Sequence, residues 1–216
     1  MSDLPLPDTP RWVEAHDLTR APASWRRQLG SGGACIGLTE SVDPIVIVYG
    51  NPDDTSLRSL ADEFPDHTLL LSHPIRDRIC TRAILHTLPD PSTLPDYEGA
   101  TPLPSDSDLT HLPIELQGEL SEAEQVFTVY VDGMPVSFAY ASSHSELYFD
   151  CAVDTAPGFR QLGLATIVAS TMIRAELAQG RDAVWGALED NLASLALARR
   201  LGFVETDHLW VAAPVL

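Results

Sequence analysis

The sequence predicts a mixed α/β fold built on a mainly antiparallel central sheet. Two segments of alternating apolar residues, Glu124–Val131 and Met134–Ala141, flank Asp132-Gly133, a dipeptide typical of tight β-hairpin turns. A third strand is predicted at Leu147–Val153, and after one helix another strand follows at Ala183–Leu188. A three-stranded meander that continues into a strand–helix–strand unit predicts both antiparallel and parallel pairs.

The composition indicates a globular protein with a strongly acidic surface. The chain has 216 residues, which is enough for one large domain or two small ones, and 44% of them are hydrophobic. The chain has 31 acidic residues and 13 basic residues, all of the latter Arg, and its net charge is −18. This charge should repel nucleic acid and anionic membranes and attract cationic partners such as amines. A solubilising surface or a salt-rich host would account for the same acidity.

Cysteine usage and the N-terminal segment predict a cytoplasmic protein. Cys35, Cys80 and Cys151 lie far apart, without a Cys-x-x-Cys pair, which argues against a zinc site and against a disulfide framework. The acidic, proline-interrupted N-terminus does not resemble a signal peptide, and no segment approaches ~18 consecutive apolar residues. We therefore expect neither a leader peptide nor a membrane span.

Residues 1–97 are expected to form an N-terminal α/β subdomain, and residues 98–216 a second domain. The boundary is expected in the Pro-, Asp- and Ser-rich segment between Pro89 and Pro113. The first part is interpreted as one or two short helices between Trp12 and Leu29, a strand at Ile45–Tyr49, a helix from a Thr55 cap to Phe64, a strand at Thr68–Leu71 and a strand or helix at Ile79–His86. The second begins with a strand at Ala100–Leu103 and a short helix at Leu109–Leu120.

The segment Arg160-Gln-Leu-Gly-Leu-Ala165 has the properties of a phosphate-binding loop. It opens a long apolar helix that ends near Gln179. The first N–H groups of a helix lack internal partners, and the helix dipole favours an anion there. Gly163 lets a phosphate approach the backbone, Ala165 keeps the first turn narrow, and Arg160 supplies positive charge. Glycine at such a junction is also ordinary turn chemistry, so the loop needs support from its surroundings.

A second helix start provides this support. The strand Ala183–Leu188 leads into Asp190-Asn191, and a short helix is predicted at Leu192–Leu201. Asn191 or Asp190 suits the N-cap, and Gly202 suits the left-handed residue that ends a helix.

This order of elements, from about Ala100 to Val215, resembles the cofactor-binding half of the GNAT superfamily of N-acetyltransferases. The segments Val153–Arg160 and Trp185–Leu195 are further similar to its zwittermicin-resistance-type branch. The resemblance implies a GNAT-like sheet with two splayed strands, which bind acetyl-CoA as a co-substrate. It implies cofactor contacts from Cys151, Ala152 and Val153 on the strand, from Arg160, Gln161, Leu162, Gly163, Leu164 and Ala165 in the loop, and from Asn191.

Three further polar residues have two readings each. Ser194 reaches either the cofactor or the N-terminal cap of its helix. Arg199 and Arg200 would meet a 3′-phosphate of the cofactor, although cations in a last helical turn are also explained by the dipole.

Two positions depart from the family pattern. Ala198 stands where many members have a Tyr that protonates the leaving thiolate, and Gly186 where others have a Glu that acts as a base. An ammonium substrate must lose a proton before it attacks, so a carboxylate or His is expected near the thioester. Asp150, in an otherwise apolar strand, is the first choice as the catalytic residue. Its alternative role is a buried carboxylate paired with an Arg.

Other residues near this strand are weaker candidates. Glu146 and His144 are bases expected in the hairpin turn, and Tyr148 and Tyr140 are substitutes for the missing acid. Cys151 is a candidate nucleophile, although a buried Cys usually serves only as a small hydrophobic residue. Strand alternation places Asp150 and Cys151 on opposite faces unless a bulge inverts them.

The sequence therefore predicts an N-acetyltransferase that moves acetyl from acetyl-CoA to a primary amine by direct attack in a ternary complex. The acceptor is expected to be small and cationic, with the N-terminal subdomain acting as a substrate-shaping region or a degenerate acetyltransferase half. The alternative is a catalytically inactive module that binds acetyl-CoA or serves assembly. A homodimer is compatible with either reading.

Overall fold

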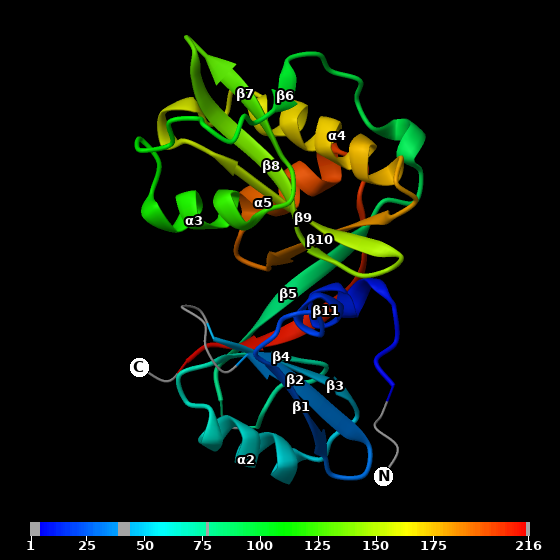
Figure 1. Ribbon diagram of the computed structural model, residues 1–216. Coiled ribbons are helices and arrows are strands. Elements are labelled where there is room, and N and C mark those ends of the chain that lie inside the picture. The colour runs from blue at the N-terminus through cyan, green and yellow to red at the C-terminus, as the bar shows by residue number, and fades with distance from the viewer. Residues whose placement is uncertain (1–4, 39–43, 77, 215–216) are drawn as a thin grey trace. The chain divides into compact units, whose positions relative to one another are not determined.

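The computed structural model describes residues 5–38, 44–76 and 78–214. The chain forms two compact units, whose elements are labelled in Figure 1. Unit 1 consists of Met1–Leu85, Gly186–Asn191 and Glu205–Leu216, and unit 2 consists of His86–Trp185 and Leu192–Val204. Unit 1 is thus assembled from three separate stretches of the chain.

Unit 1 is a mixed sheet with two helices. Its elements are η1 (Pro10–Trp12), α1 (Val13–Leu18), β1 (Ser24–Leu29), β2 (Gly33–Leu38), β3 (Ile45–Gly50), α2 (Asp54–Glu63), β4 (Thr68–Leu71), β5 (Cys80–Thr87) and β11 (Val204–Ala212). The strands follow the order β1-β2-β3-β4-β11-β5. The first three strands are antiparallel neighbours, and β3 and β4 are parallel.

The strands of unit 1 are only partly those expected. Ile45–Tyr49 and Thr68–Leu71 are strands, as predicted, and the ambiguous segment Ile79–His86 is the strand β5. The prediction of helices throughout Trp12–Leu29 was wrong at its end, because Ser24–Leu29 is β1. This segment pairs along its whole length with Gly33–Leu38, and such pairing overrides local helix preference.

Helix α2 begins two residues earlier than expected. Its N-cap is Asp53 rather than Thr55, and the Asp53 side chain accepts a hydrogen bond from the Ser56 backbone N–H at 2.8 Å.

The core explains why β3 is a continuous apolar run. Val46 and Val48 pack in one buried cluster while Ile47 and Tyr49 pack in another, so both faces of the strand are covered.

Unit 2 contains the predicted meander. Its elements are η2 (Pro91–Thr93), β6 (Ala100–Pro102), α3 (Ile114–Glu122), β7 (Val126–Val131), β8 (Met134–His144), β9 (Tyr148–Thr155), η3 (Pro157–Phe159), α4 (Leu164–Leu177), β10 (Asp182–Leu188, whose last residues lie in unit 1) and α5 (Leu192–Arg200). The strand order is β10-β9-β8-β7-β6, with β6 to β9 antiparallel and β10 parallel to β9. The predicted mixed, mainly antiparallel sheet is confirmed.

The two faces of the unit 2 sheet carry different helices. Helix α4 packs against β7, β8 and β9. On the other face, Leu120 of α3 packs with Phe138 and Tyr140 of β8 in a buried cluster. Residues of β9 alternate between the faces accordingly, since Cys151 is buried and the neighbouring Ala152 packs against the α3 cluster. Cys151 and Asp150 therefore point to opposite faces, and the alternation of β9 is not inverted by a bulge.

The two units repeat one topology. In unit 1 the meander β1-β2-β3 is followed by α2 and by β4, which is parallel to β3. In unit 2 the meander β7-β8-β9 is followed by α4 and by β10, which is parallel to β9. Among the described residues, every helix falls short of the length and hydrophobicity that a membrane span requires.

Candidate functional site

Strands β9 and β10 separate part of the way along their length. Their parallel register runs from Asp182↔Tyr148 to Val184↔Asp150, and there it ends. Strand β9 continues beyond this point to Thr155, and β10 continues to Leu188. The pair is therefore splayed, as predicted, and Asp150 sits where the gap begins.

The loop after β9 leaves the N-terminus of α4 open. Gly163 occupies the N-cap position with φ of 82°, in the left-handed region, and no described side chain caps the helix. The first helical hydrogen bonds run from the N–H groups of Thr166 and Ile167 to the Gly163 carbonyl, at 3.1 and 3.4 Å. The preceding N–H groups of Leu164 and Ala165 have no helical acceptor.

Free space also adjoins Gly163 at this helix start. A Cβ atom built on Gly163 would meet nothing within 4 Å. Gln161 also has positive φ, 63°, so the loop turns twice through the left-handed region before the helix begins. Open backbone N–H groups, the positive end of the α4 dipole and free space together fit a phosphate group.

Arg160 is held beside this cradle. Its Nε donates a hydrogen bond to the carbonyl oxygen of Thr155, at 3.0 Å, which ties the side chain to the end of β9. This bond uses one of the five N–H donors of the guanidinium. The side chain of Leu162, also in the loop, is 65% exposed and offers apolar surface at the same place.

The start of α5 is tied to β10 by a side-chain bond. The indole Nε1 of Trp185 donates to Ser194 Oγ at 2.9 Å, so the Ser194 hydroxyl anchors the helix. The N–H of Asn191 donates to the Leu188 carbonyl at 2.9 Å, which forms the turn before α5. At its other end Gly202 has φ of 94°, and α5 stops there as predicted.

Asp150 receives a hydrogen bond from a bulge in the neighbouring strand. The register shifts between Ala141 and Ser143 of β8, which makes Ser142 an extra residue. The Ser142 hydroxyl donates to Asp150 Oδ2 at 2.9 Å. Asp150 is half-buried, so its carboxylate is held in place and still accessible.

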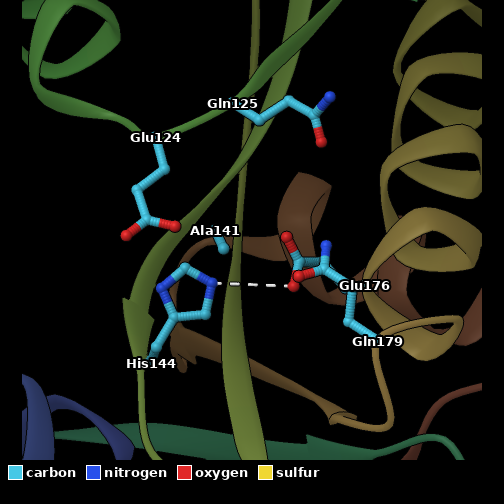
Figure 2. A pocket seen from close by; sticks show the side chains of 6 residues that line it. All are labelled: Glu124, Gln125, Ala141, His144, Glu176 and Gln179. Carbon is cyan, nitrogen blue, oxygen red and sulfur yellow. Dashed lines mark ion pairs between the residues drawn. The ribbon is translucent and has the colours of Figure 1, made fainter.

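The other candidate bases lie around the start of β9. Glu146 is exposed in the turn that precedes the strand, about 13 Å of extended chain from Asp150. His144 is the last residue of β8, pairs in register with Phe149, and forms an ion pair with Glu176 (Figure 2).

Tyr140 is held by a hydrogen bond to Glu119, and Cys151 is buried. The Tyr140 hydroxyl donates to Glu119 Oε2, and burial and this hydrogen bond raise the pKa of Tyr140 above its ordinary value. Burial also raises the pKa of the Cys151 thiol well above its ordinary value, and the charges of Asp150 and Glu176 add to the shift. Cys151 is thus kept as a buried thiol and is not activated as a nucleophile. Tyr148 is half-buried at the start of β9.

Sequence reasoning missed one carboxylate on the splayed part of β9. Asp154 shares a face with Asp150 and Ala152, and burial raises its pKa, with a further contribution from Glu119 and an opposing one from Arg160. The i, i+4 spacing of the two Asp residues on a predicted strand was the available indication. At the positions where the family pattern has other residues, Ala198 is fully buried and Gly186 is exposed.

The comparisons with known proteins agree with this geometry. A model of the GNAT acetyltransferase family matches residues 127–211, which include the meander, the loop and α5. No curated protein matches the chain closely enough to count as a relative.

Solved structures share the fold over nearly the whole chain. A GCN5-related N-acetyltransferase-like protein from Streptococcus suis 89/1591 has a TM-score of 0.63 at 16% identity, and the match covers 94% of this chain and 97% of that one. A GCN5-related N-acetyltransferase from Kribbella flavida has the same TM-score, 0.63, at 16% identity, with 95% of each chain covered. A tandem GNAT protein from the clavulanic acid biosynthesis pathway has a TM-score of 0.53 at 16% identity, with coverage of 95% and 94%.

The fold is therefore that of the GNAT acetyltransferases. Residues 127–211 match the model of the GNAT acetyltransferase family.

Proposed function

We propose that this protein is an acetyl-CoA-dependent N-acetyltransferase that acetylates the primary amine of a small cationic molecule. The observation that carries the proposal is the uncapped N-terminus of α4 directly after a splayed strand. The open N–H groups of Leu164 and Ala165, the space at Gly163 and the guanidinium of Arg160 would hold the pyrophosphate of acetyl-CoA. The zwittermicin-resistance-type motifs support placing the chain in that branch of the family.

The remaining cofactor contacts follow from the position of β9. The backbone of Cys151, Ala152 and Val153 lies in the part of the strand that β10 no longer pairs with, so its hydrogen-bonding groups are available to the pantetheine arm. Asn191 stands before α5, where it would meet the cofactor as family members do. We assign Ser194 to anchoring α5 through Trp185, because its hydroxyl already accepts that hydrogen bond.

Asp150 would act as the general base. The proton of the ammonium substrate passes to the Asp150 carboxylate, directly or through a water, and the freed nitrogen attacks the thioester carbonyl carbon. The carbon–sulfur bond then breaks and the CoA thiolate leaves. A thiolate is a weakly basic leaving group, so the reaction does not require a dedicated acid in place of Ala198. The hydrogen bond from Ser142 would orient the carboxylate toward the gap.

Charge supports a cationic acceptor. The chain carries a net charge of −18, and Asp150 and Asp154 stand on one face of the splayed strand. We further propose that unit 1 is a degenerate acetyltransferase half, because it repeats the meander–helix–strand topology of unit 2. Cys35, Cys80 and Cys151 are all free thiols, which supports a reducing cytoplasm.

The rival function is a non-catalytic module that binds acetyl-CoA. Ala198 and Gly186 would favour it, whereas the placement of Asp150 at the start of the gap favours catalysis. Release of free CoA thiol separates the two. Protein, acetyl-CoA and a panel of primary amines should liberate thiol with at least one amine, together with a product 42 mass units heavier than the amine, as expected for acetyl replacing a proton. Binding of CoA without thiol release from any amine would favour the module.

A further inference from the structure

The turn between β10 and α5 carries Asn191, the residue proposed above to meet acetyl-CoA. The turn runs from Leu188 to Asn191, and the hydrogen bond between the N–H of its last residue and the carbonyl of its first makes Glu189 and Asp190 its two central residues. All four residues belong to unit 1. The conformation of this turn therefore decides where the Asn191 side chain lies.

Arg82 of β5 holds this turn by its first central residue. The Arg82 guanidinium donates from Nε and Nη2 to Glu189 Oε2, at 2.9 and 2.7 Å. The Arg82 backbone N–H donates to the other carboxylate oxygen, Oε1, at 3.2 Å, and the Glu189 N–H donates to the Arg82 carbonyl at 2.8 Å. Both the side chain and the backbone of Glu189 are thus bound by Arg82, and we call these hydrogen bonds the Arg82–Glu189 clasp.

The carboxylate in the clasp is charged at neutral pH. Hydrogen bonds from the Arg82 side chain, and then from its backbone, lower the pKa of Glu189 below its ordinary value. Hydrogen bonds between two ionised groups are shorter and stronger than neutral ones, and the planar guanidinium fixes their direction. The clasp therefore restricts the orientation of Glu189 as well as its distance from β5.

The effect of the clasp is expected on the turn and not on the stability of the whole protein. The side chains of Arg82 and Glu189 are 45% and 37% exposed, and exposed ion pairs contribute little to the free energy of unfolding. A comparable pair in unit 1 joins β1 to the last residue of α2, where Arg27 Nη1 donates to both carboxylate oxygens of Glu63 at 2.8 Å. That pair holds no residue assigned to the cofactor, so it separates the two effects.

We propose that Arg82 is a positioning residue for acetyl-CoA, which through its clasp on Glu189 fixes the turn in the conformation that presents Asn191 to the cofactor. The inference rests on the proposed function, because it requires that acetyl-CoA meets Asn191. It gives unit 1 a role in cofactor binding, since Arg82 and the turn both belong to that unit. The phosphate cradle at Gly163 does not depend on the clasp, so loss of the clasp weakens cofactor binding without abolishing it.

The test is the affinity of the full chain for CoA, measured by isothermal titration in wild type, Arg82→Gln, Asn191→Ala and the double variant. Arg82→Gln should weaken CoA binding about 3- to 10-fold, a size typical of residues that act on a ligand through another element. In the Asn191→Ala background the same substitution should have no further effect, because Asn191 is the group through which Arg82 acts. Equal losses in the two backgrounds would overturn the proposal, and so would wild-type affinity in Arg82→Gln.

Two further variants separate positioning from other roles, with folding checked by urea unfolding. Glu189→Ala removes the partner in the clasp and should weaken CoA as much as Arg82→Gln does. Wild-type affinity in Glu189→Ala would overturn the proposal, because Arg82 would then act without the clasp. Arg27→Gln breaks the comparable exposed pair of unit 1 and should leave CoA affinity unchanged. An equal loss in Arg27→Gln would also overturn the proposal, because any weakening of unit 1 would then have the same effect.

Wild type itself separates this inference from the proposed function. If wild type binds no CoA, the acetyl-CoA assignment and the role of Arg82 are both wrong. If wild type binds CoA and Gly163→Val does not, while Arg82→Gln and Glu189→Ala bind as wild type does, only the role of Arg82 is wrong.

Discussion

Ser142 and Asp150 are joined by a hydrogen bond that crosses from the β8 bulge to the point where β9 leaves β10. The hydroxyl donates to Oδ2 at 2.9 Å, and the bulge exists because Ser142 is an extra residue in the register of the two strands. One carboxylate is thereby fixed at the entrance of the gap between splayed strands. Its position there is the basis of the first prediction.

Asp150→Asn should lower turnover at neutral pH by at least about 100-fold, because general-base assistance is typically worth ~10²–10⁴-fold. CoA affinity should stay nearly unchanged, since the strand backbone is what faces the pantetheine. The loss should shrink at high pH, where the amine is already neutral. Initial rates of thiol release from pH 7 to 10 check this.

The matched control for this variant is Asp182→Asn, which removes the same charge from the exposed start of β10 and should leave turnover unchanged. Wild-type turnover in Asp150→Asn would move the role to another group, with Asp154 as the next carboxylate on that face. An unfolded Asp150→Asn would indicate that the carboxylate is structural.

Gly163→Val should abolish the stabilisation that CoA gives. A ligand at 100 times its Kd stabilises the folded state by about 2.7 kcal/mol, which appears as a higher Tm. The valine side chain would project into the space where the phosphate is expected. The measurement is the Tm of wild type and variant with and without millimolar CoA.

Gly180→Val is the matched control for strain. Gly180 lies just beyond the other end of α4, has φ of 85° compared with 82° for Gly163, and its Cβ would also meet nothing within 4 Å. Both variants should lose similar intrinsic stability, about 1–2 kcal/mol for a side chain forced into the left-handed region. Only Gly180→Val should retain the CoA-dependent rise. Equal rises in both would show that the phosphate site is elsewhere.

One molecule of CoA should bind per chain despite the repeated topology. The helix of unit 1 that corresponds to α4 is α2, and its N-terminus is closed by Asp53, which accepts from the N–H and the hydroxyl of Ser56 at 2.8 and 3.1 Å. Those hydrogen bonds lower the pKa of Asp53, so a negative charge occupies the position of a phosphate. Isothermal titration should give a stoichiometry near one for wild type and no binding for Gly163→Val. Two equivalents would contradict the idea that unit 1 is degenerate.

Glu176 should make stability depend on pH in acid. Burial raises its pKa, but contacts with His144 and Arg181 hold the pKa in the folded state below the ordinary 4.5. Its contribution is therefore fully present above that value and is lost as the pH falls through the folded pKa. At about pH 6, wild type should exceed Glu176→Gln by about 2 kcal/mol, the value of hydrogen bonds to a charged group. Urea unfolding should show this difference shrinking as the pH is lowered toward 3.

Glu122→Gln serves as the exposed control for the acid series and should follow wild type throughout. A difference between wild type and Glu176→Gln that stays constant with pH would mean that Glu176 is not charged in the folded protein.

Features set by local chemistry were predicted best. The hairpin at Asp132-Gly133 has both residues at positive φ, 51° and 80°, as a tight two-residue turn requires. Gly163 and Gly202 start and stop helices where their neighbours indicated. The facing of Asp150 and Cys151 was open, because a bulge in β9 would have inverted it; the register shift lies in β8 instead.

Features set by distant partners were not predictable in the same way. Ser24–Leu29 is a strand because Gly33–Leu38 pairs with it, and its own apolar spacing gave no indication of that pairing. The bulge at Ser142 depends on the register between two strands, which the sequence does not display. The hydrogen bond from the Tyr140 hydroxyl to Glu119 likewise depends on the packing of α3 over the sheet.

The three-part composition of unit 1 has a consequence for how the protein is made. Strand β4 pairs with β11 through Leu71↔Trp210, Leu70↔Val211 and Leu69↔Ala212, so its partner is translated some 140 residues later. Until then Leu69–Leu71 is an apolar strand with one open edge, a site for incorrect pairing with other nascent chains. Expression of residues 1–97 alone should therefore yield aggregate, and a chaperone that shields open strand edges during synthesis should raise the yield of the intact chain.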